Sequence, residues 1–116
     1  MGIVNILVII ESPYAASQDR TVEQNIDYAK ACIRDSLMRG ESPFASHVIY
    51  TLEGILDDLS PSERKIGIEA GFKWRDVSEL TVFYIDYGYS DGMQLGLQDC
   101  ISKNKPYEIR RLFKGE

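Results

Sequence analysis

Two short polar segments of this sequence combine residue types that suit the binding of a nucleotide. In the first, Tyr14 can stack on a base, and Ser12 can hydrogen-bond to a sugar or phosphate oxygen. Pro13 fixes the turn between them. Glu11 is less expected, because a carboxylate at the end of a strand usually needs a partner or a ligand. An ordinary surface turn is the alternative interpretation of residues 11–14.

The second segment, residues 86–92, leads directly into the start of an expected helix. Free backbone N–H groups and the helix dipole favour an anion at such a position. Ser90 can donate a further hydrogen bond to a phosphate, and Gly92 allows the backbone to approach the ligand closely. Asp91 would repel a phosphate unless it points away or binds a ribose hydroxyl. A plain capped loop is the alternative, and the local pattern does not decide between the two.

His47 follows a short extended stretch, so it too can face a ligand crevice, although a lone histidine is more often structural than catalytic. Cys32 and Cys100 stand far apart on apolar helical faces, which predicts reduced thiols in the core. With one histidine and two cysteines in the chain, no metal site and no cofactor is expected. The candidate ligand-binding residues are Glu11, Ser12, Pro13, Tyr14, His47, Asp86, Ser90, Asp91, Gly92 and Met93.

The elements that position these residues alternate between strands and helices. A nearly continuous β-branched run at residues 3–10 predicts a strand that is buried on both faces. Further strands are predicted at residues 42–46, 80–85 and 107–113. The pattern of residues 47–58 is ambiguous, and a short helix is the interpretation that we favour there.

Three longer helices have clear N-terminal signals. Thr21 and Gln24 resemble a capping box, and Gly40 fits the end of the helix that they start. Ser60 precedes a proline and a third-position glutamate, and Ser90 can cap the last helix. The apolar periodicity predicts which residues face inward. They are Ile66, Ala70, Trp74 and Val77 in the second helix, and Met93, Leu97, Cys100 and Ile101 in the third.

This alternation predicts one α/β domain over residues 1–116, with a parallel sheet covered by helices on both faces. Parallel strands need crossover connections, and helices supply them. In such sheets, ligands bind beyond the carboxyl ends of the strands. The loops at residues 11–20 and 86–92 follow the first and third strands, so we expect both to face one ligand crevice.

The composition restricts the class of protein. The chain has 116 residues, of which 44% are hydrophobic, and this share is ordinary for a globular protein. Its net charge of −5 repels a phosphate backbone, which argues against nucleic acid as a partner. The apolar run at residues 3–10 is too short to span a bilayer and lacks the features of a signal peptide. We therefore expect a cytoplasmic protein without a membrane partner.

Three motifs together resemble the nucleoside 2-deoxyribosyltransferase-like superfamily, and in particular its small phage-associated members. They are Ser12-Pro13-Tyr14, Asn25-Ile26-Asp27-Tyr28-Ala29 and Ser90-Asp91-Gly92-Met93. Their order and spacing extend the resemblance over residues 3–113. It implies a flavodoxin-like three-layer sandwich with a mainly parallel sheet of about 4–5 strands. It also implies a homo-oligomer in which neighbouring subunits help to complete the sites.

Enzymes of that superfamily cleave or exchange the N-glycosidic bond of nucleosides or nucleoside monophosphates. A glutamate near the start of the last helix attacks the anomeric carbon. In the monophosphate-specific members a loop serine, matched here by Ser90, helps to hold the phosphate. The glutamate's position corresponds to Gly96 in this sequence. Gln94 and Gln98 are the neighbouring alternatives, but neither is an anionic nucleophile, and Glu69 is a candidate substitute for a second acid of the family. No catalytic residue is assigned, and whether the protein is an enzyme stays open.

Three functions remain open. In the first, which we favour, the protein binds a nucleotide-derived small molecule without turnover. A viral protein of this kind would sequester a cyclic nucleotide or ADP-ribose-type defence signal in the host cytoplasm. In the second, Glu11, Asp86 or Asp91 replaces the missing glutamate, and the protein is an N-glycosidase or deoxyribosyltransferase acting on a nucleoside 5′-monophosphate. In the third, the pocket is empty and the domain is a protein-interaction module.

Overall fold

Strands and helices alternate through residues 5–113, the part of the chain that this computed structural model describes. The strands are β1 (Leu7–Glu11), β2 (Ser42–Phe44), β3 (Leu80–Tyr84) and β4 (Tyr107–Arg110). The helices are α1 (Val22–Met38), α2 (Ser46–Ile49), α3 (Pro61–Val77) and α4 (Asp91–Ser102). The predicted alternation is confirmed, with a first strand that begins later than expected. Residues 3 and 4 of that predicted strand lie outside the described residues.

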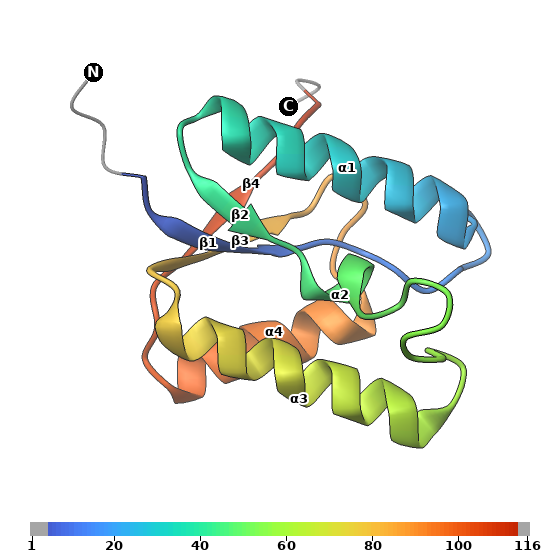
Figure 1. The fold of residues 1–116 in the computed structure, drawn as a ribbon. Helices are drawn as coiled ribbons and strands as arrows, with labels where there is room; N and C mark the ends of the chain where they lie inside the picture. The colour runs from blue at the N-terminus through green and yellow to red at the C-terminus, as the bar shows by residue number, and fades with distance from the viewer. Residues whose placement is uncertain (1–4, 114–116) are drawn as a thin grey trace.

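The strands form a parallel sheet in the order β2-β1-β3-β4. In its register, Ile9 of β1 lies opposite Phe44 of β2 and Thr81 of β3. The chain winds from β1 toward one edge and from β3 toward the other, so the winding direction reverses between these two central strands. Figure 1 shows α1 on one face of the sheet and both α3 and α4 on the other. The α/β class and the flavodoxin-like three-layer architecture are therefore confirmed.

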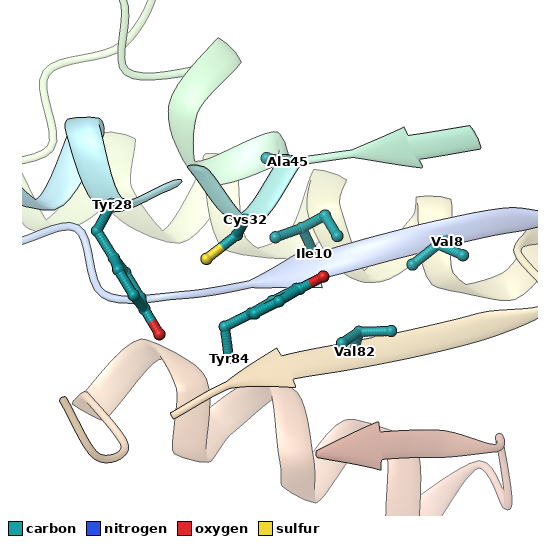
Figure 2. Close-up of a cluster of buried hydrophobic side chains, with 7 residues drawn as sticks. All are labelled: Val8, Ile10, Tyr28, Cys32, Ala45, Val82 and Tyr84. Carbon is teal, nitrogen blue, oxygen red and sulfur yellow. The ribbon is translucent and has the colours of Figure 1, made fainter. Parts of the chain in front are cut away.

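The β-branched residues of β1 form the centre of the core, as their sequence pattern predicts. Val8 and Ile10 are each 1% exposed and pack against Tyr84 of β3. Figure 2 shows Tyr28 and Cys32 reaching from α1 toward this cluster. Cys32 and Cys100 are both buried, which confirms their predicted place in the core. Burial raises the pKa of Cys32 to about 12, so this thiol is inert at neutral pH.

Local capping signals set the starts of the three long helices where the sequence places them. Thr21 and Gln24 form a reciprocal capping box before α1. Ser60 accepts a hydrogen bond from the backbone N–H of Glu63 before α3. Ser90 likewise accepts from the backbone N–H of Met93, at 3.2 Å, before α4. Each cap satisfies a backbone donor that the first helical turn leaves free.

The predicted inward face of α3 is wrong. Trp74 is 45% exposed, and Ile66 and Val77 are also exposed. The residues that α3 buries are Gly71 and Arg75. A Cβ at residue 71 would lie 2.6 Å from Ser46 Oγ, so a larger residue there would displace the Ser46 hydroxyl where α2 approaches α3. Apolar periodicity misses this face because its buried positions are a glycine and a charged residue rather than aliphatic side chains.

Trp74 instead lies over the edge strand β2. Its ring centroid is 4.9 Å from that of Phe44, and its indole N–H donates to the Tyr50 hydroxyl. Ile101, predicted to face inward from α4, is 61% exposed, while Met93 and Cys100 are buried as predicted. Among residues 5–113, no helix combines the length and apolar character needed to cross a membrane.

Candidate functional site

A cavity of about 640 Å³ opens at the carboxyl ends of β1 and β3. The loop after β1 contributes Tyr14 to its lining, and the loop after β3 contributes Ser90. Residues of α2, of the segment that follows it and of α3 as far as Phe72 complete the walls. The winding of the sheet reverses between β1 and β3, and ligand sites of open α/β sheets form at such a switch point. The topology therefore brings together the two loops that the sequence nominates.

Most of the predicted site residues line this cavity. They are Glu11, Ser12, Pro13, Tyr14, His47, Ser90, Asp91, Gly92 and Met93. Their convergence follows from the parallel sheet, because loops after neighbouring parallel strands leave the sheet at the same edge. Whether these residues contact a ligand stays a prediction.

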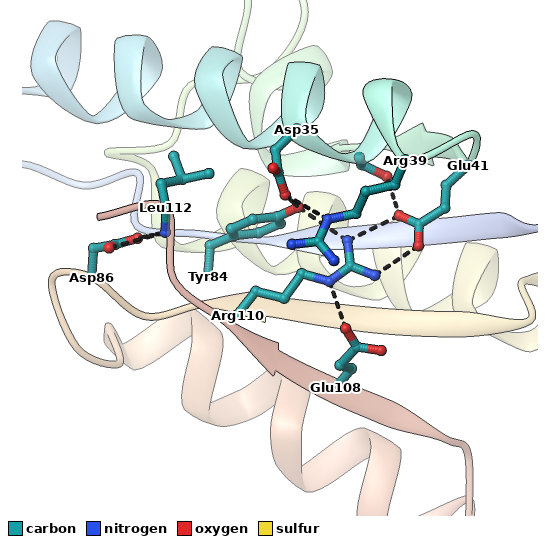
Figure 3. Close-up of polar contacts among 9 residues, drawn as sticks. Asp35, Arg39, Glu41, Tyr84, Asp86, Glu108, Arg110 and Leu112 are labelled. Atoms are coloured by element: carbon teal, nitrogen blue, oxygen red, sulfur yellow. Dashed lines mark hydrogen bonds and ion pairs between the residues drawn. The ribbon is translucent and has the colours of Figure 1, made fainter. Parts of the chain in front are cut away.

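Asp86 does not belong to this lining. Its carboxylate accepts hydrogen bonds from the backbone N–H groups of Leu112 and Phe113, which follow β4, and from the Tyr28 hydroxyl. Figure 3 shows Asp86 directed at Leu112. These donors outweigh the effect of burial and lower the pKa of Asp86. The structure thus gives Asp86 the role of anchoring the chain after β4, rather than a place at the cavity.

Glu11, the last residue of β1, is held by a buried arginine. Arg75 is 1% exposed, and its Nη2 contacts the Glu11 carboxylate. Its Nη1 donates to Asp99 Oδ2 at 2.8 Å and its Nε to Thr81 Oγ1 at 3.1 Å. Burial raises the pKa of Glu11 to about 7, while the Arg75 guanidinium acts in the opposite direction. A carboxyl group that is 16% exposed and has an elevated pKa therefore faces the cavity.

Gly96 lies directly against this carboxyl group. A Cβ at residue 96 would be 2.8 Å from Cδ of Glu11, so any larger residue would displace the Glu11 side chain. The neighbouring α4 residues Gln94 and Gln98 are exposed. Glu69, the other candidate acid, is an exposed residue of α3 that pairs with Lys65. A carboxylate from β1 therefore occupies the space that a side chain at residue 96 of α4 would fill.

Ser12 and His47 form a second polar pair at the cavity. The Ser12 hydroxyl lies 2.7 Å from His47 Nε2, and Ser12 is 4% exposed. Burial lowers the pKa of His47 to about 4, so its imidazole is neutral at physiological pH. The pair therefore presents neutral donors and acceptors, which suit the polar edge of a base or a sugar hydroxyl better than a phosphate.

Several residues that line the cavity are not among those predicted from the sequence. Arg20, Tyr87 and Tyr89 belong to the two nominated loops, and Arg64 lies in the first turns of α3. Arg20 directly precedes the capping box at Thr21. This position at the end of the loop after β1 is the sequence signal that could have identified it as a cavity residue. Arg64 carries no such signal, because only the packing of α3 against α4 brings its Nη2 within 3.8 Å of a Cβ position at residue 92.

Residues 6–110 match the protein family described as "Domain of unknown function (DUF7768)". The chain belongs to the DUF7768 family. No curated protein matches this DUF7768 chain. Among solved structures, it is similar to a 2-deoxyribosyltransferase from the psychrotolerant bacterium Bacillus psychrosaccharolyticus, with a TM-score of 0.62 and 18% sequence identity. The match covers 95% of the DUF7768 chain and 74% of the transferase chain, and it shows that the two proteins share a fold.

Proposed function

We propose that this DUF7768 protein binds a nucleotide-derived small molecule, without turnover, in the cavity at the carboxyl ends of β1 and β3. The observation that carries the proposal is that Tyr14 and Ser90, from separate loops, line one cavity. Its volume of about 640 Å³ lies within the usual range for small-molecule sites. The transferase that shares this fold is described as a biocatalyst for nucleoside synthesis, which supports a nucleoside-related ligand.

Each wall of the cavity has a distinct role in this proposal. Tyr14 stacks on the base, and the neutral pair of Ser12 and His47 hydrogen-bonds to its polar edge or to the sugar. Ser90 and the first turn of α4 hold a phosphate, with backbone N–H groups as donors. Asp91 binds a ribose hydroxyl, which removes its conflict with the phosphate.

The absence of turnover in this proposal follows from Gly96 and from the state of Glu11. Gly96 has no side chain to attack an anomeric carbon. Glu11, the carboxylate nearest to it, is bound to Arg75, and this pairing reduces its strength as a nucleophile. Removal of a covalent nucleophile costs many orders of magnitude in rate, because the mechanism itself is lost.

In its more detailed form, the proposal is that a homo-oligomer retains a cyclic nucleotide or ADP-ribose-type signal. In a phage-infected cytoplasm, such retention would withdraw the signal from host defence. Retention requires slow release, and contacts from two loops and from α3 around one cavity support it.

A second candidate function, cleavage of an N-glycosidic bond, is favoured by one observation. The Glu11 carboxyl group reaches the space beside Gly96, and with a pKa of about 7 about half of it is ionised, and so able to act as a nucleophile, at neutral pH. In this alternative, a Glu11 oxygen bonds to the anomeric carbon while the bond to the base nitrogen breaks. The leaving base takes its proton from a water molecule, and water then hydrolyses the sugar ester, which releases the sugar and restores the Glu11 carboxylate.

One incubation distinguishes the two functions. Purified protein is mixed with a panel of nucleoside 5′-monophosphates, cyclic nucleotides and ADP-ribose, then denatured, and the released compounds are separated by chromatography. We expect one compound to be recovered unchanged at about one equivalent per binding site. Free base that accumulates over many turnovers would instead establish the glycosidase. Recovery of no compound at all would favour the protein-interaction module.

Glu11→Gln sharpens this result, because it preserves the size of the side chain and removes its negative charge. For a binding protein, we expect ligand retention to change by less than about tenfold, since the amide still fills the space beside Gly96. For a glycosidase, the same variant would lose turnover while retaining the ligand. Glu69→Gln removes a carboxylate on the exposed face of α3 and serves as the matched control.

A further inference from the structure

Arg20, the residue before the N-cap of α1, presents a fixed guanidinium group to the cavity. Its Nε donates to Asn25 Oδ1 at 3.0 Å. Its guanidinium carbon lies 4.3 Å from the centroid of the Tyr87 ring, within the range of a cation–π contact. One edge of the guanidinium group and one of its faces are therefore occupied, which restricts the rotation of the side chain.

The groups that hold Arg20 are themselves fixed. Asn25 is fully buried, and its amide nitrogen donates to the carbonyl oxygens of Tyr14 and Ala15, each at 3.0 Å. These two bonds determine the amide orientation and leave Oδ1 as the acceptor for Arg20. The Ser17 hydroxyl accepts from the backbone N–H of Arg20 at 3.2 Å. The loop after β1 thus organises this guanidinium group in advance of any ligand.

The charge of Arg20 is not compensated within the described residues. Across residues 5–113, its Nη1 and Nη2 have no hydrogen-bond partner, and no carboxylate lies within ion-pair distance. Arg64, the other arginine that lines the cavity, has Asp58 Oδ1 at 4.0 Å from its Nε. In an acidic protein with a net charge of −5, an unpaired arginine fixed at a cavity is an attractive position for an anionic group.

We propose that Arg20 is a specificity-determining anion subsite, which selects phosphorylated nucleotides over the corresponding nucleosides. Its two terminal nitrogens donate to the oxygens of one phosphate group, and Tyr87 keeps the guanidinium plane in place. The inference rests on the proposed binding function and adds the residue that reads the charge of the ligand. A guanidinium group offers paired donors that match two phosphate oxygens, whereas a lysine offers a single ammonium group.

Calorimetric titrations test this subsite with paired probes. Each of the four common ribonucleosides and its 5′-monophosphate is titrated into the wild-type protein, Arg20→Ala and Arg20→Lys. For the base that binds, we expect Arg20→Ala to weaken the monophosphate by roughly tenfold to a hundredfold and the nucleoside by less than about twofold. Arg20→Lys should fall between the wild type and Arg20→Ala, because it retains the charge and loses the paired donors.

Arg34→Ala is the matched control, since it removes the same charge from an exposed position of α1. It should leave both affinities within about twofold of the wild type. An equal loss of nucleoside and monophosphate affinity in Arg20→Ala would overturn the inference, because it would indicate a disturbed loop rather than a lost phosphate contact. Unchanged monophosphate affinity would overturn it as well. If the wild-type protein binds none of these probes and also retains no cyclic nucleotide or ADP-ribose, the proposed function itself fails, and that result is distinct from the other two. If it retains a cyclic nucleotide or ADP-ribose instead, unchanged affinity for that ligand in Arg20→Ala would overturn the inference alone.

Discussion

Two buried arginines lie on opposite faces of the sheet, and each is the centre of an ion-pair cluster. The two clusters differ in whether they leave a carboxyl group available at the cavity. Arg75 is 1% exposed on the face covered by α3 and α4, and Arg110 is 7% exposed on the side of α1. Arg75 pairs with Glu11 and Asp99, and Arg110 pairs with Glu41 and Glu108. We call these groups the Arg75 cluster and the Arg110 cluster.

The two clusters differ in how their carboxylates are satisfied. Arg110 donates to both oxygens of Glu41, at 2.9 and 2.7 Å, and this chelation lowers the pKa of Glu41. Figure 3 shows this cluster closed around Arg110, with Tyr84 beside it. Glu11 receives a contact from one nitrogen of Arg75 only, and burial raises its pKa to about 7. The closed cluster therefore stabilises the fold, whereas the open one leaves a carboxyl group available at the cavity.

The largest expected effect comes from removal of each arginine. Arg75→Met leaves the largely buried carboxyl group of Glu11 without a cation, whereas Asp99 keeps its ion pair with Lys103. We expect a loss of about 3–5 kcal/mol in the free energy of unfolding. Arg110→Met should cost less, about 1–3 kcal/mol, because Glu108 is half-exposed and can be hydrated. Urea unfolding of both variants, followed by circular dichroism at pH 7, measures the difference.

Glu11→Gln combined with Arg75→Met provides the internal check. It removes the uncompensated carboxylate, so part of the stability lost in Arg75→Met should return. If Arg110→Met proves the more damaging single change, the distinction between an open and a closed cluster is wrong. If Arg75→Met does not fold, Arg75→Lys, which retains the charge, allows the same comparison.

The next effect concerns the pH dependence of stability. The folded-state pKa of Glu11 is raised from 4.5 to about 7. Its contribution to the free energy of unfolding is therefore fully present below pH about 4.5 and is lost as the pH rises to about 7. This shift corresponds to at most about 3 kcal/mol. The pKa of Glu41 is lowered, so its contribution is present above pH 4.5 and is lost as the pH falls.

Unfolding free energies between pH 3 and 8 therefore separate the two glutamates. Glu11→Gln should remove a decline between pH about 4.5 and 7, and Glu41→Gln should remove a decline on the acid side. Burial lowers the pKa of His47 to about 4, so the stability that neutral His47 contributes is lost as the pH falls from 6.5 to about 4. In this range, the effect of His47 on the free energy of unfolding is opposite to that of Glu11. Because wild type and Glu11→Gln both contain His47, their difference isolates Glu11. A flat difference curve would contradict the raised pKa.

The sequence predicts those parts of the fold that depend on local signals. Thr21, Ser60 and Ser90 identify the helix starts, because a capping side chain acts within one helical turn. The parallel topology then places the loops after β1 and β3 at one edge, and this general rule predicts the meeting of Tyr14 and Ser90. Neither inference requires knowledge of contacts between distant residues.

The rest of the site depends on contacts that no local pattern encodes. Glu11 and Arg75 are 64 positions apart, and a charged residue in an amphipathic helix ordinarily indicates an exposed face. The apolar periodicity therefore predicts a core position for Trp74 and an exposed one for Arg75. Asp86 illustrates the reverse case. A carboxylate in a loop after a strand resembles a ligand-binding residue until the backbone N–H of Leu112 is seen to donate to it.

The smallest expected effect concerns the hydroxyl group beside each arginine. Thr81 Oγ1 is the acceptor for Arg75 Nε, and both residues are 1% exposed. Thr81→Val preserves the shape and leaves a buried charged donor unsatisfied, so we expect a loss of about 1–3 kcal/mol. Tyr84→Phe in the Arg110 cluster should cost only about 1 kcal/mol. Arg110 Nη1 still donates to Glu41, and Asp35 retains its bond from Arg39.

Chemical denaturation at pH 7 measures the free energy of unfolding of both variants. Thr51→Val provides a control away from both clusters, because the Thr51 hydroxyl bonds only to backbone carbonyls of α2. An equal cost for Tyr84→Phe and Thr81→Val would show that the closed cluster has no spare acceptor. We expect the larger loss for Thr81→Val, because the two arginines differ in the number of acceptors that remain. Each nitrogen of Arg110 retains a carboxylate partner without Tyr84, whereas Nε of Arg75 depends on Thr81 alone.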